Sequence, residues 1–252
     1  MKLNQIAAVV LAAGKGTRIN ARHINKVMYP LAGKPMIGYT IELLNKVGFQ
    51  KIIVVVGFKK ESIINYLKNK VVYAEQEVRL GTAHALKCAL LKIPSGIENI
   101  FVCYSDDTSF YPSLIIEEFV NLHLEKKNDL TLLTLVKKDP TGLGRILRDK
   151  NGNITNIIEE KSCNDQQKKI KEINTGCYCF KTDFIKEFLP LIKKDPLKKE
   201  YYLTDIVELA IKSQKKVEAL KISRGDYFQG VNTKEQLEQV DAKMRFKQGS
   251  NS

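Results

Sequence analysis

The fold is decided by the stretch Ile6-Ala-Ala-Val-Val-Leu-Ala-Ala-Gly-Lys-Gly-Thr-Arg18. Its first part, residues 6–13, is an uninterrupted apolar run, which is typical of a strand buried on both faces of a parallel sheet. Met1-Lys2 and this run together also resemble a secretion signal, but the run has only eight residues and leads directly into a basic, glycine-rich loop. We therefore expect a buried first strand that ends in a loop at the carboxyl edge of a sheet.

Strand-like apolar runs and amphipathic helical patterns alternate along the first half of the chain. Further strands are expected at 52–56, 71–74, 100–104 and 130–136. Helices are expected at 36–47, 61–68, 82–91 and 113–125. This rhythm predicts an α/β fold with a Rossmann-like mixed, mostly parallel sheet flanked by helices on both faces. Ligands of such sheets bind at the carboxyl ends of the strands.

The second half is more mixed. Asn151-Gly152 separates two extended runs, 145–148 and 154–158, and predicts an inserted β-hairpin. Strands at 172–180 and 217–222 and helices at 183–192 and 203–212 follow. Thr233-x-x-Gln236 is a capping box that opens a last helix to about Arg245. Without a linker in between, we expect one domain over 1–246 and a flexible tail over 247–252.

Composition narrows the class of partner. Of the 252 residues, 44% are hydrophobic and 27% charged, which is typical of a folded globular protein. Lysine and arginine total 41 against 28 acidic residues, so the formal net charge of +13 favours anionic partners. No apolar run approaches the roughly 20 residues that span a bilayer. Five cysteines, an odd number, indicate a reducing compartment, and we expect a cytoplasmic protein.

Three segments carry candidate chemistry. In the loop, Gly14 and Gly16 permit backbone conformations that aim N–H groups at an anion, although a plain tight turn is the alternative. Lys26 follows at a span that can fold back over the same site, unless it is only a solvated surface lysine. Asp106 ends an apolar strand, where a carboxylate beside phosphates can hold Mg²⁺ or simply cap a helix. His23 and His123 are expected at the surface.

Several further short motifs occur in a fixed order over about residues 6–245. The set comprises Leu11–Arg18, Asn25–Met36, Gln76 with Leu80–His84, Tyr104–Asp106, Thr141–Ile146, Glu159–Lys161, Ile173–Gly176, Glu200–Asp205 and Gly230–Asn232. This ordered set resembles the sugar-1-phosphate nucleotidyltransferases, or nucleoside-diphosphate-sugar pyrophosphorylases. The similarity is closest to the uridylyltransferase half of the bifunctional bacterial enzymes that make UDP-N-acetylglucosamine.

The resemblance implies a reaction and a set of site residues. The reaction is NTP, most simply UTP, plus N-acetylglucosamine or glucose 1-phosphate giving NDP-sugar and pyrophosphate. The nucleotide would contact Leu11, Ala12, Ala13, Gly14, Gln76, Gly81 and Thr82, together with Gly16 of the same loop. The catalytic phosphate contacts would be Arg18 and Lys26, and the Mg²⁺ ligands Asp106 and Asn232. The sugar would contact Tyr104, Gly142, Glu159 and Asn174, mostly from elements within about 140–205.

The chemistry needs no strong general base, because the attacking sugar phosphate is already an anion. The protein must instead bring mutually repelling phosphates together and stabilise the charge that develops. The sequence departs from the family pattern at several positions that bear on base and sugar choice. These are Arg79 for a neutral residue, Ser105 for Gly, Asp107 as a second carboxylate and Thr108 for Pro. Asn25 also stands where the family motif has Pro.

Other interpretations stay open. One is a cytidylyl- or thymidylyltransferase acting on another phosphorylated sugar or alcohol, and another is a regulatory homologue that binds without turnover. A different class is a basic nucleic-acid-binding module, although no recognition helix or RNA-binding signature appears. We expect small-molecule substrates, no nucleic-acid or membrane partner, and a monomer or small homo-oligomer. The hexapeptide repeats of the bifunctional enzymes do not occur, so no acetyl transfer is expected.

Overall fold

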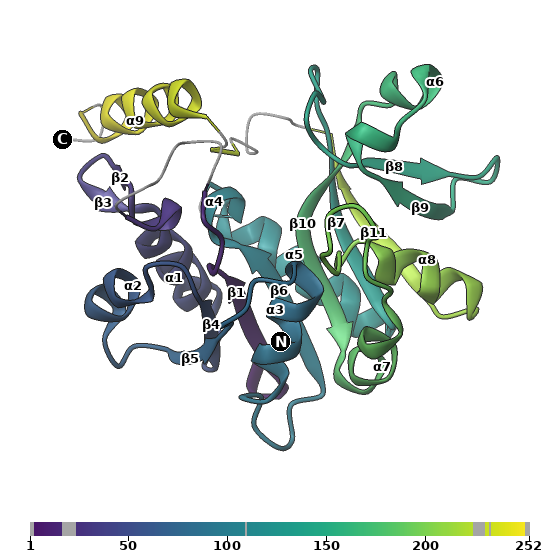
Figure 1. Ribbon diagram of the computed structural model, residues 1–252, viewed down its shortest axis with the longest axis horizontal. Helices are drawn as coiled ribbons and strands as arrows, with labels where there is room; N and C mark the ends of the chain where they lie inside the picture. The colour runs from purple at the N-terminus through teal and green to yellow at the C-terminus, as the bar shows by residue number, and fades with distance from the viewer. Residues whose placement is uncertain (1–2, 17–23, 109, 224–229, 232, 250–252) are drawn as a thin grey trace.

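A single twisted sheet organises the computed structural model, which describes residues 3–16, 24–108, 110–223, 230–231 and 233–249 (Figure 1). Its main strands are β1 (Ile6–Leu11), β4 (Ile52–Val56), β5 (Val72–Glu75), β6 (Asn99–Tyr104), β7 (Leu130–Val136), β10 (Glu172–Lys181) and β11 (Val217–Ile222). They lie in the order β11-β7-β10-β6-β1-β4-β5. Only β10 runs antiparallel to its two neighbours on this path. The predicted mixed, mostly parallel sheet is confirmed.

Helices cover both faces of the sheet. They are α1 (Met36–Val47), α2 (Lys60–Leu67), α3 (Thr82–Leu90), α5 (Ser113–Lys126), α7 (Thr182–Phe188) and α8 (Asp205–Lys212). Because successive side chains of a strand point to opposite faces, β1 serves two cores. Ile6, Ala8 and Val10 pack with residues of α1, α2 and α5, whereas Ala7 and Val9 pack with residues of α3, α7 and α8. Strand β1 therefore needs apolar side chains on both of its faces, which explains its fully apolar sequence.

The predicted hairpin is present. Strand β8 (Arg145–Arg148) pairs antiparallel with β9 (Ile154–Ile158), and β8 also pairs with β10 at Ile173. The Asp149 carboxylate fixes the turn by accepting the N–H groups of Asn151 and Asn153 at 2.9 and 2.8 Å. The hairpin and the short helix α6 (Asp165–Lys168) stand at one end of the sheet, on the side of β10 (Figure 1).

The last helix packs against a segment from the first part of the chain. Helix α9 (Lys234–Gly249) lies beside the small two-stranded sheet formed by β2 (Pro30–Leu31) and β3 (Lys34–Pro35) (Figure 1). Leu31, Val231 and Val240 share a small buried cluster, and the Asp241 carboxylate accepts the Ala32 N–H at 2.6 Å. The predicted capping box is confirmed by bonds of 3.1 and 3.2 Å between Thr233 and Gln236.

Several boundaries differ from the expectation. The first strand ends at Leu11 rather than residue 13, and the residues expected as the polar end of β6 form a short helix, α4 (Ser105–Thr108). Helix α7 ends earlier and continues as a 3-10 turn at Leu189–Leu191, while α8 begins two residues later than expected. Helix α9 runs past Arg245 to Gly249. The remaining short 3-10 segments are Leu3–Gln5, Lys26–Met28 and Glu160–Ser162.

The surface placement expected for His123 is wrong, and His23 lies outside the described residues. His123 is 1% exposed, with Nδ1 at 2.8 Å from Thr131 Oγ1 and Nε2 at 3.1 Å from Asn99 Oδ1. Burial, aided by the nearby charge of Lys181, lowers the pKa of His123 to about 4. The five cysteines are all free thiols. None of the described helices is long and apolar enough to cross a bilayer.

Candidate functional site

The candidate site is a cleft of about 680 Å³ at the carboxyl edge of the sheet. The parallel strands β1 and β6 end there side by side, since Leu11 at the end of β1 is paired with Tyr104 at the end of β6. The chain leaves β1 toward β4 on one side, while β6 lies on the other. This is the topological switch point of an open α/β sheet, where the diverging connections leave room for a ligand.

Fourteen of the sixteen residues proposed from the sequence line this one cleft. They are Leu11, Ala12, Ala13, Gly14, Gly16, Lys26, Gln76, Gly81, Thr82, Tyr104, Asp106, Gly142, Glu159 and Asn174. The other two, Arg18 and Asn232, lie outside the described residues. Motifs that are far apart in the sequence therefore share one surface, although their individual roles stay predictions.

Gln76 is held rigidly at the end of the cleft nearest α3. The side chain is 4% exposed, and its Nε2 donates to the Gly81 carbonyl at 2.9 Å and lies 3.0 Å from Nδ1 of His84. Burial lowers the pKa of His84, which favours a neutral ring able to accept this hydrogen bond. Because a carbonyl can only accept, the amide nitrogen of Gln76 must face Gly81. Both amide hydrogens are thus engaged within the chain.

Gly81 is required by a close approach. Its φ is +96°, and a Cβ there would lie 2.4 Å from the Tyr201 carbonyl oxygen. That segment is bound on both sides, because Tyr201 N–H donates to Leu80 O at 2.7 Å and Tyr201 O accepts from Ala83 N–H at 3.0 Å. The Leu203 N–H also donates to Thr82 Oγ1 at 2.9 Å. The segment before α8 is therefore fixed against the start of α3.

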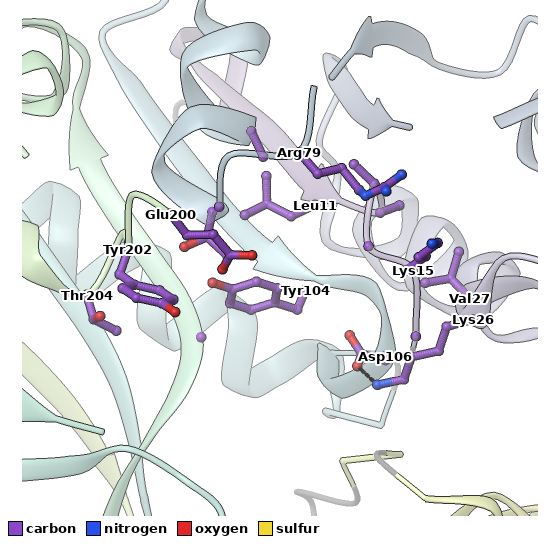
Figure 2. Close-up of a pocket in the computed structure, with 18 of the residues that line it drawn as sticks. Leu11, Lys15, Lys26, Val27, Arg79, Tyr104, Asp106, Glu200, Tyr202 and Thr204 are labelled. Atoms are coloured by element: carbon purple, nitrogen blue, oxygen red, sulfur yellow. Dashed lines mark hydrogen bonds and ion pairs between the residues drawn. The ribbon is translucent and has the colours of Figure 1, made fainter. Parts of the chain in front are cut away.

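Lys26 and Asp106 form an ion pair on the opposite side of the cleft (Figure 2). Their side chains are only 13% and 17% exposed. Asp106 comes directly after β6, in the first turn of α4, and the preceding Ser105 carbonyl accepts from Thr40 Oγ1 at 2.9 Å. The hydroxyl of Ser105 is itself buried and makes no hydrogen bond among the described residues. The substitution of Ser for Gly in the motif has no evident compensating contact.

Asn25 fixes the position of Lys26, a role that sequence reasoning missed. The Asn25 side chain is fully buried, and its Oδ1 accepts the Val27 N–H at 3.1 Å, which caps the short 3-10 helix containing Lys26. Its Nδ2 donates to Ala12 O at 3.1 Å and to Phe58 O at 2.7 Å. A proline at this position could not make these bonds. The only sequence signal was the departure from the family motif.

The residues at this end of the cleft suit a hard cation. Mg²⁺ is commonly held by one or two protein carboxylates, with water and substrate phosphates completing the shell. Asp106 offers such a carboxylate within the cleft. In the described part of the chain, no group of three or more His, Cys, Asp or Glu side chains is placed to hold a metal. A site completed by water and substrate phosphates therefore fits the carboxylate of Asp106.

The opposite wall presents Tyr104, Asn174 and neighbouring carboxylates. Gly176 has φ +77°, and a Cβ there would lie 2.2 Å from Cδ2 of the Tyr104 ring. Gly176 lies within the stretch between Asn174 and Tyr178 where the register of β10 against β7 shifts. The Asn174 side chain is fixed by donating to Tyr178 Oη at 2.7 Å and accepting the Gly176 N–H at 3.1 Å. The Ile173–Gly176 motif thus positions Tyr104 and Asn174, two of the residues expected to bind the sugar.

Arg145 joins the Gly142 loop to the carboxylate segment of the hairpin. Its guanidinium is 2% exposed, donates to the Leu143 carbonyl and pairs with Glu160 at 2.5 Å. This pairing, with a further bond from the Gly142 N–H, lowers the pKa of Glu160. Glu159, next in the chain, then lines the cleft.

Glu200, Tyr202 and Thr204 also line the cleft, without any role having been assigned to them from sequence. Figure 2 shows Glu200 and Tyr202 on the same side of the cleft as Tyr104, and Lys26 with Asp106 on the other. The motif Glu200–Asp205 was recognised in the sequence, but which of its side chains face the cleft could not be predicted without the fold. At the end of this motif, burial raises the pKa of Asp205 to about 6, and the nearby negative charges of Glu208 and Glu159 contribute to the rise.

Comparison with known proteins agrees with this geometry. The family model for nucleotidyl transferases matches residues 7–241, most of the chain. The chain belongs to the nucleotidyl transferase family. The resemblance found in the sequence motifs is thereby confirmed at family level.

Curated relatives of this nucleotidyl transferase are named bifunctional protein GlmU. Identity is 37% to that of Thermoanaerobacter pseudethanolicus, over 95% of this chain and 52% of the relative. It is 39% to that of Carboxydothermus hydrogenoformans, over 91% and 50%, and 38% to that of Neisseria meningitidis serogroup B, over 96% and 52%. The chain spans about half the length of the curated relatives it matches.

Solved structures share the fold. A protein described as a glucose-1-phosphate thymidylyltransferase from Bacillus anthracis superposes with a TM-score of 0.80 at 21% identity, over 95% of both chains. An apo UDP-glucose pyrophosphorylase superposes with a TM-score of 0.79 at 20% identity, over 96% of this chain and 99% of that one. These likenesses establish the architecture of this nucleotidyl transferase, not its substrates.

Proposed function

We propose that this chain transfers a uridylyl group from UTP to a sugar 1-phosphate. A phosphate oxygen of the sugar attacks the α-phosphorus, the bond from that phosphorus to the bridging oxygen breaks, and pyrophosphate leaves. The observation that carries the proposal is the single cleft that places Gln76 and the Gly14 loop, the Lys26–Asp106 pair, and the Asn174 wall around one space. A nucleotide, reacting phosphates and a sugar require such a succession of surfaces.

The choice of base rests on Gln76. Since both of its amide hydrogens are engaged by Gly81 and His84, the group left to face a ligand is the carbonyl oxygen, an acceptor. Uracil and thymine carry an N–H at ring position 3, whereas cytosine carries an acceptor there. The arrangement supports UTP or dTTP over CTP, and the resemblance to enzymes that make UDP-sugars favours UTP.

The choice of sugar rests on the far wall. Asn174 and Glu159 supply the acceptors that sugar hydroxyls need, and Tyr104 supplies an aromatic surface beside them. The resemblance to enzymes that make UDP-N-acetylglucosamine supports N-acetylglucosamine 1-phosphate as the first candidate and glucose 1-phosphate as the second. The alternative in the same class is thymidylyl transfer to another phosphorylated sugar.

Charge neutralisation is the main catalytic task. Mg²⁺, held at Asp106 and by expectation at Asn232, would stabilise the phosphate charge that otherwise keeps the two substrates apart. Lys26 lies within contact of Asp106 and can donate to a phosphate oxygen when that carboxylate binds the cation instead. Arg18 remains a second expected cation. No side chain need remove a proton from the nucleophile.

The setting of the reaction is also a proposal. Five free thiols fit the reducing cytoplasm, where the nucleotide substrates are found. We propose small-molecule substrates alone, with the net charge of +13 serving phosphate-rich ligands rather than nucleic acid or a membrane surface. Either a monomer or a small homo-oligomer is compatible with a cleft built from one chain.

The test is a pyrophosphate-release screen of UTP, dTTP, CTP and ATP against the 1-phosphates of N-acetylglucosamine, glucose, galactose and mannose. We expect UTP with N-acetylglucosamine 1-phosphate or glucose 1-phosphate to turn over, and Asp106→Ala to abolish that Mg²⁺-dependent turnover with an unchanged circular-dichroism spectrum. Nucleotide-sugar binding without turnover would instead indicate a regulatory homologue. Steeply salt-dependent nucleic-acid binding without pyrophosphate release would indicate the different class.

A further inference from the structure

Phe58 is fixed against the end of the first strand, where the glycine-rich loop begins, although none of the sequence motifs includes this residue. It follows β4, its N–H donates to Ala13 O at 3.3 Å, and its carbonyl accepts from the buried Asn25 Nδ2 at 2.7 Å. The preceding Gly57 permits this approach, because a Cβ there would lie 2.9 Å from Cβ of Ala13. The backbone of Phe58 is thus bound to the end of the first strand through Ala13 and to the segment that carries Lys26 through Asn25.

The Phe58 ring lies close to two cations from different segments. Lys15 Nζ is 5.7 Å and Arg79 Cζ 5.9 Å from the ring centroid, within the range of cation–π attraction. Figure 2 shows the Arg79 side chain extending toward the loop that carries Lys15. Both residues line the cleft. A phenylalanine held by Asn25 therefore supports two positive charges at one edge of the site.

These two charges are available to a ligand. No ion pair among the described residues involves Lys15 or Arg79. Like charges near one ring repel each other, and a ligand with several negative charges placed between them would turn that repulsion into attraction. Among the proposed substrates and products, the terminal phosphates of the NTP and pyrophosphate carry the highest density of negative charge.

We propose that Arg79 and Lys15, supported by Phe58, bind the terminal phosphates of the nucleoside triphosphate and the pyrophosphate product. The inference rests on the proposed function and names a further part of the same site. It separates three tasks along the nucleotide. Gln76 contacts the base, the Lys26–Asp106 pair serves the reacting phosphate, and Arg79 with Lys15 holds the leaving group. It also assigns a function to Arg79, which stands where the family motif has a neutral residue.

The test compares binding of UTP, UMP and pyrophosphate by calorimetry, in the presence of Mg²⁺, to the wild type and to Arg79→Met. We expect UTP and pyrophosphate affinity to fall about tenfold and UMP affinity to stay within about twofold, since one charge-assisted phosphate contact is lost. Lys87→Met is the matched control. It removes one exposed lysine from α3 that does not line the cleft, and should leave all three affinities unchanged.

Two results would overturn the inference. Unchanged UTP affinity in Arg79→Met would mean that the guanidinium does not reach the phosphates. An equal loss for UMP and UTP would mean that Arg79 contacts the base or ribose instead. A wild type that binds no nucleotide and releases no pyrophosphate would sink the proposed function itself, which is a different outcome.

A second variant tests the support. Phe58→Leu keeps an apolar side chain but removes the ring face, and we expect a smaller loss of UTP affinity than for Arg79→Met. In the Phe58→Leu background, Arg79→Met should then cost less than it does alone, because the guanidinium is already less well placed. Fully additive effects of the two substitutions would show that the ring does not position Arg79.

Discussion

The ammonium of Lys26 contacts the carboxylate of Asp106, so a residue expected to bind phosphate and one expected to bind metal are paired with each other. Both come from short 3-10 or α-helical turns at the carboxyl edge of the sheet, and both side chains are largely shielded from water. A divalent cation at Asp106 Oδ2 would have to compete with this ammonium. If Asp106 binds a divalent cation, as proposed, the pair would couple that binding to the release of Lys26 toward a phosphate.

Lys26→Met should raise the affinity of the nucleotide-free protein for Mn²⁺, used as a probe for Mg²⁺, by about fivefold, since a partly buried ion pair is worth on the order of 1 kcal/mol. The same variant should lower kcat/KM by about 10²-fold, because a phosphate contact is lost. Metal binding is followed by electron paramagnetic resonance. Lys15→Met is the control for general electrostatics, and an equal rise in that variant would contradict direct competition.

Gln76→Ala should lower the preference for UTP over CTP by about tenfold, because a single acceptor facing ring position 3 distinguishes the two bases. The measurement is kcat/KM for both nucleotides at saturating sugar 1-phosphate. We expect the loss to fall mainly on UTP. If both nucleotides suffer equally, Gln76 acts only through Gly81 and His84, as a structural support for the start of α3.

Gly176→Ala should be more destabilising than Gly152→Ala, although both glycines have positive φ. At Gly152, φ is +85° and an added Cβ would meet no atom within 4 Å, so only about 1 kcal/mol of backbone strain is expected. At Gly176 the Tyr104 ring adds a steric cost of about 1–3 kcal/mol. Urea unfolding gives both values. Only Gly176→Ala should also raise KM for the sugar 1-phosphate, and equal effects of the two variants would contradict the close approach.

Because His123 is buried, we expect the free energy of unfolding to fall at acidic pH. Its pKa is about 4 in the folded chain against 6.5 ordinarily, so the unfolded chain takes up the proton first as the pH falls. The neutral ring contributes its full stability above about pH 6.5 and loses about 3 kcal/mol as the pH falls toward 4. His123→Gln should therefore be less stable than the wild type at pH 7.5 and approach it at pH 4.5 in urea unfolding. A pH-independent difference would exclude protonation of His123 as the cause.

Strands and helices with strong periodicity were predictable from sequence, because burial on one or two faces dictates their pattern. The β1 and β4 runs are apolar throughout since each faces two cores. Helix α1 ends at Val47 as expected, and Gly48 terminates it with φ +102°. The short helix at Ser105–Thr108 was not predictable. Its polar residues suit a turn equally well, and only the packing around Thr40 and the cleft decides between them.

Sequence motifs predicted many of the residues that line the cleft. They did not predict which residues hold those side chains in position. Asn25 and Phe58 carry no chemistry of their own, and their importance lies in hydrogen bonds and ring contacts between segments that only the fold brings together. His123 was misplaced for a related reason. A histidine on an amphipathic helix looks solvated until Thr131 and Asn99, from two other strands, supply partners for both ring nitrogens.

Strand β10 joins the walls of the cleft in one covalent piece. Its carboxyl half pairs with β6, which leads to Asp106, and its amino end pairs with the hairpin at Ile173. The irregular register between Asn174 and Tyr178 separates these two halves. An exchange of hairpins between relatives would thus alter acceptor choice while the donor half kept its alignment, which makes this strand a natural crossover point for engineering new sugar products.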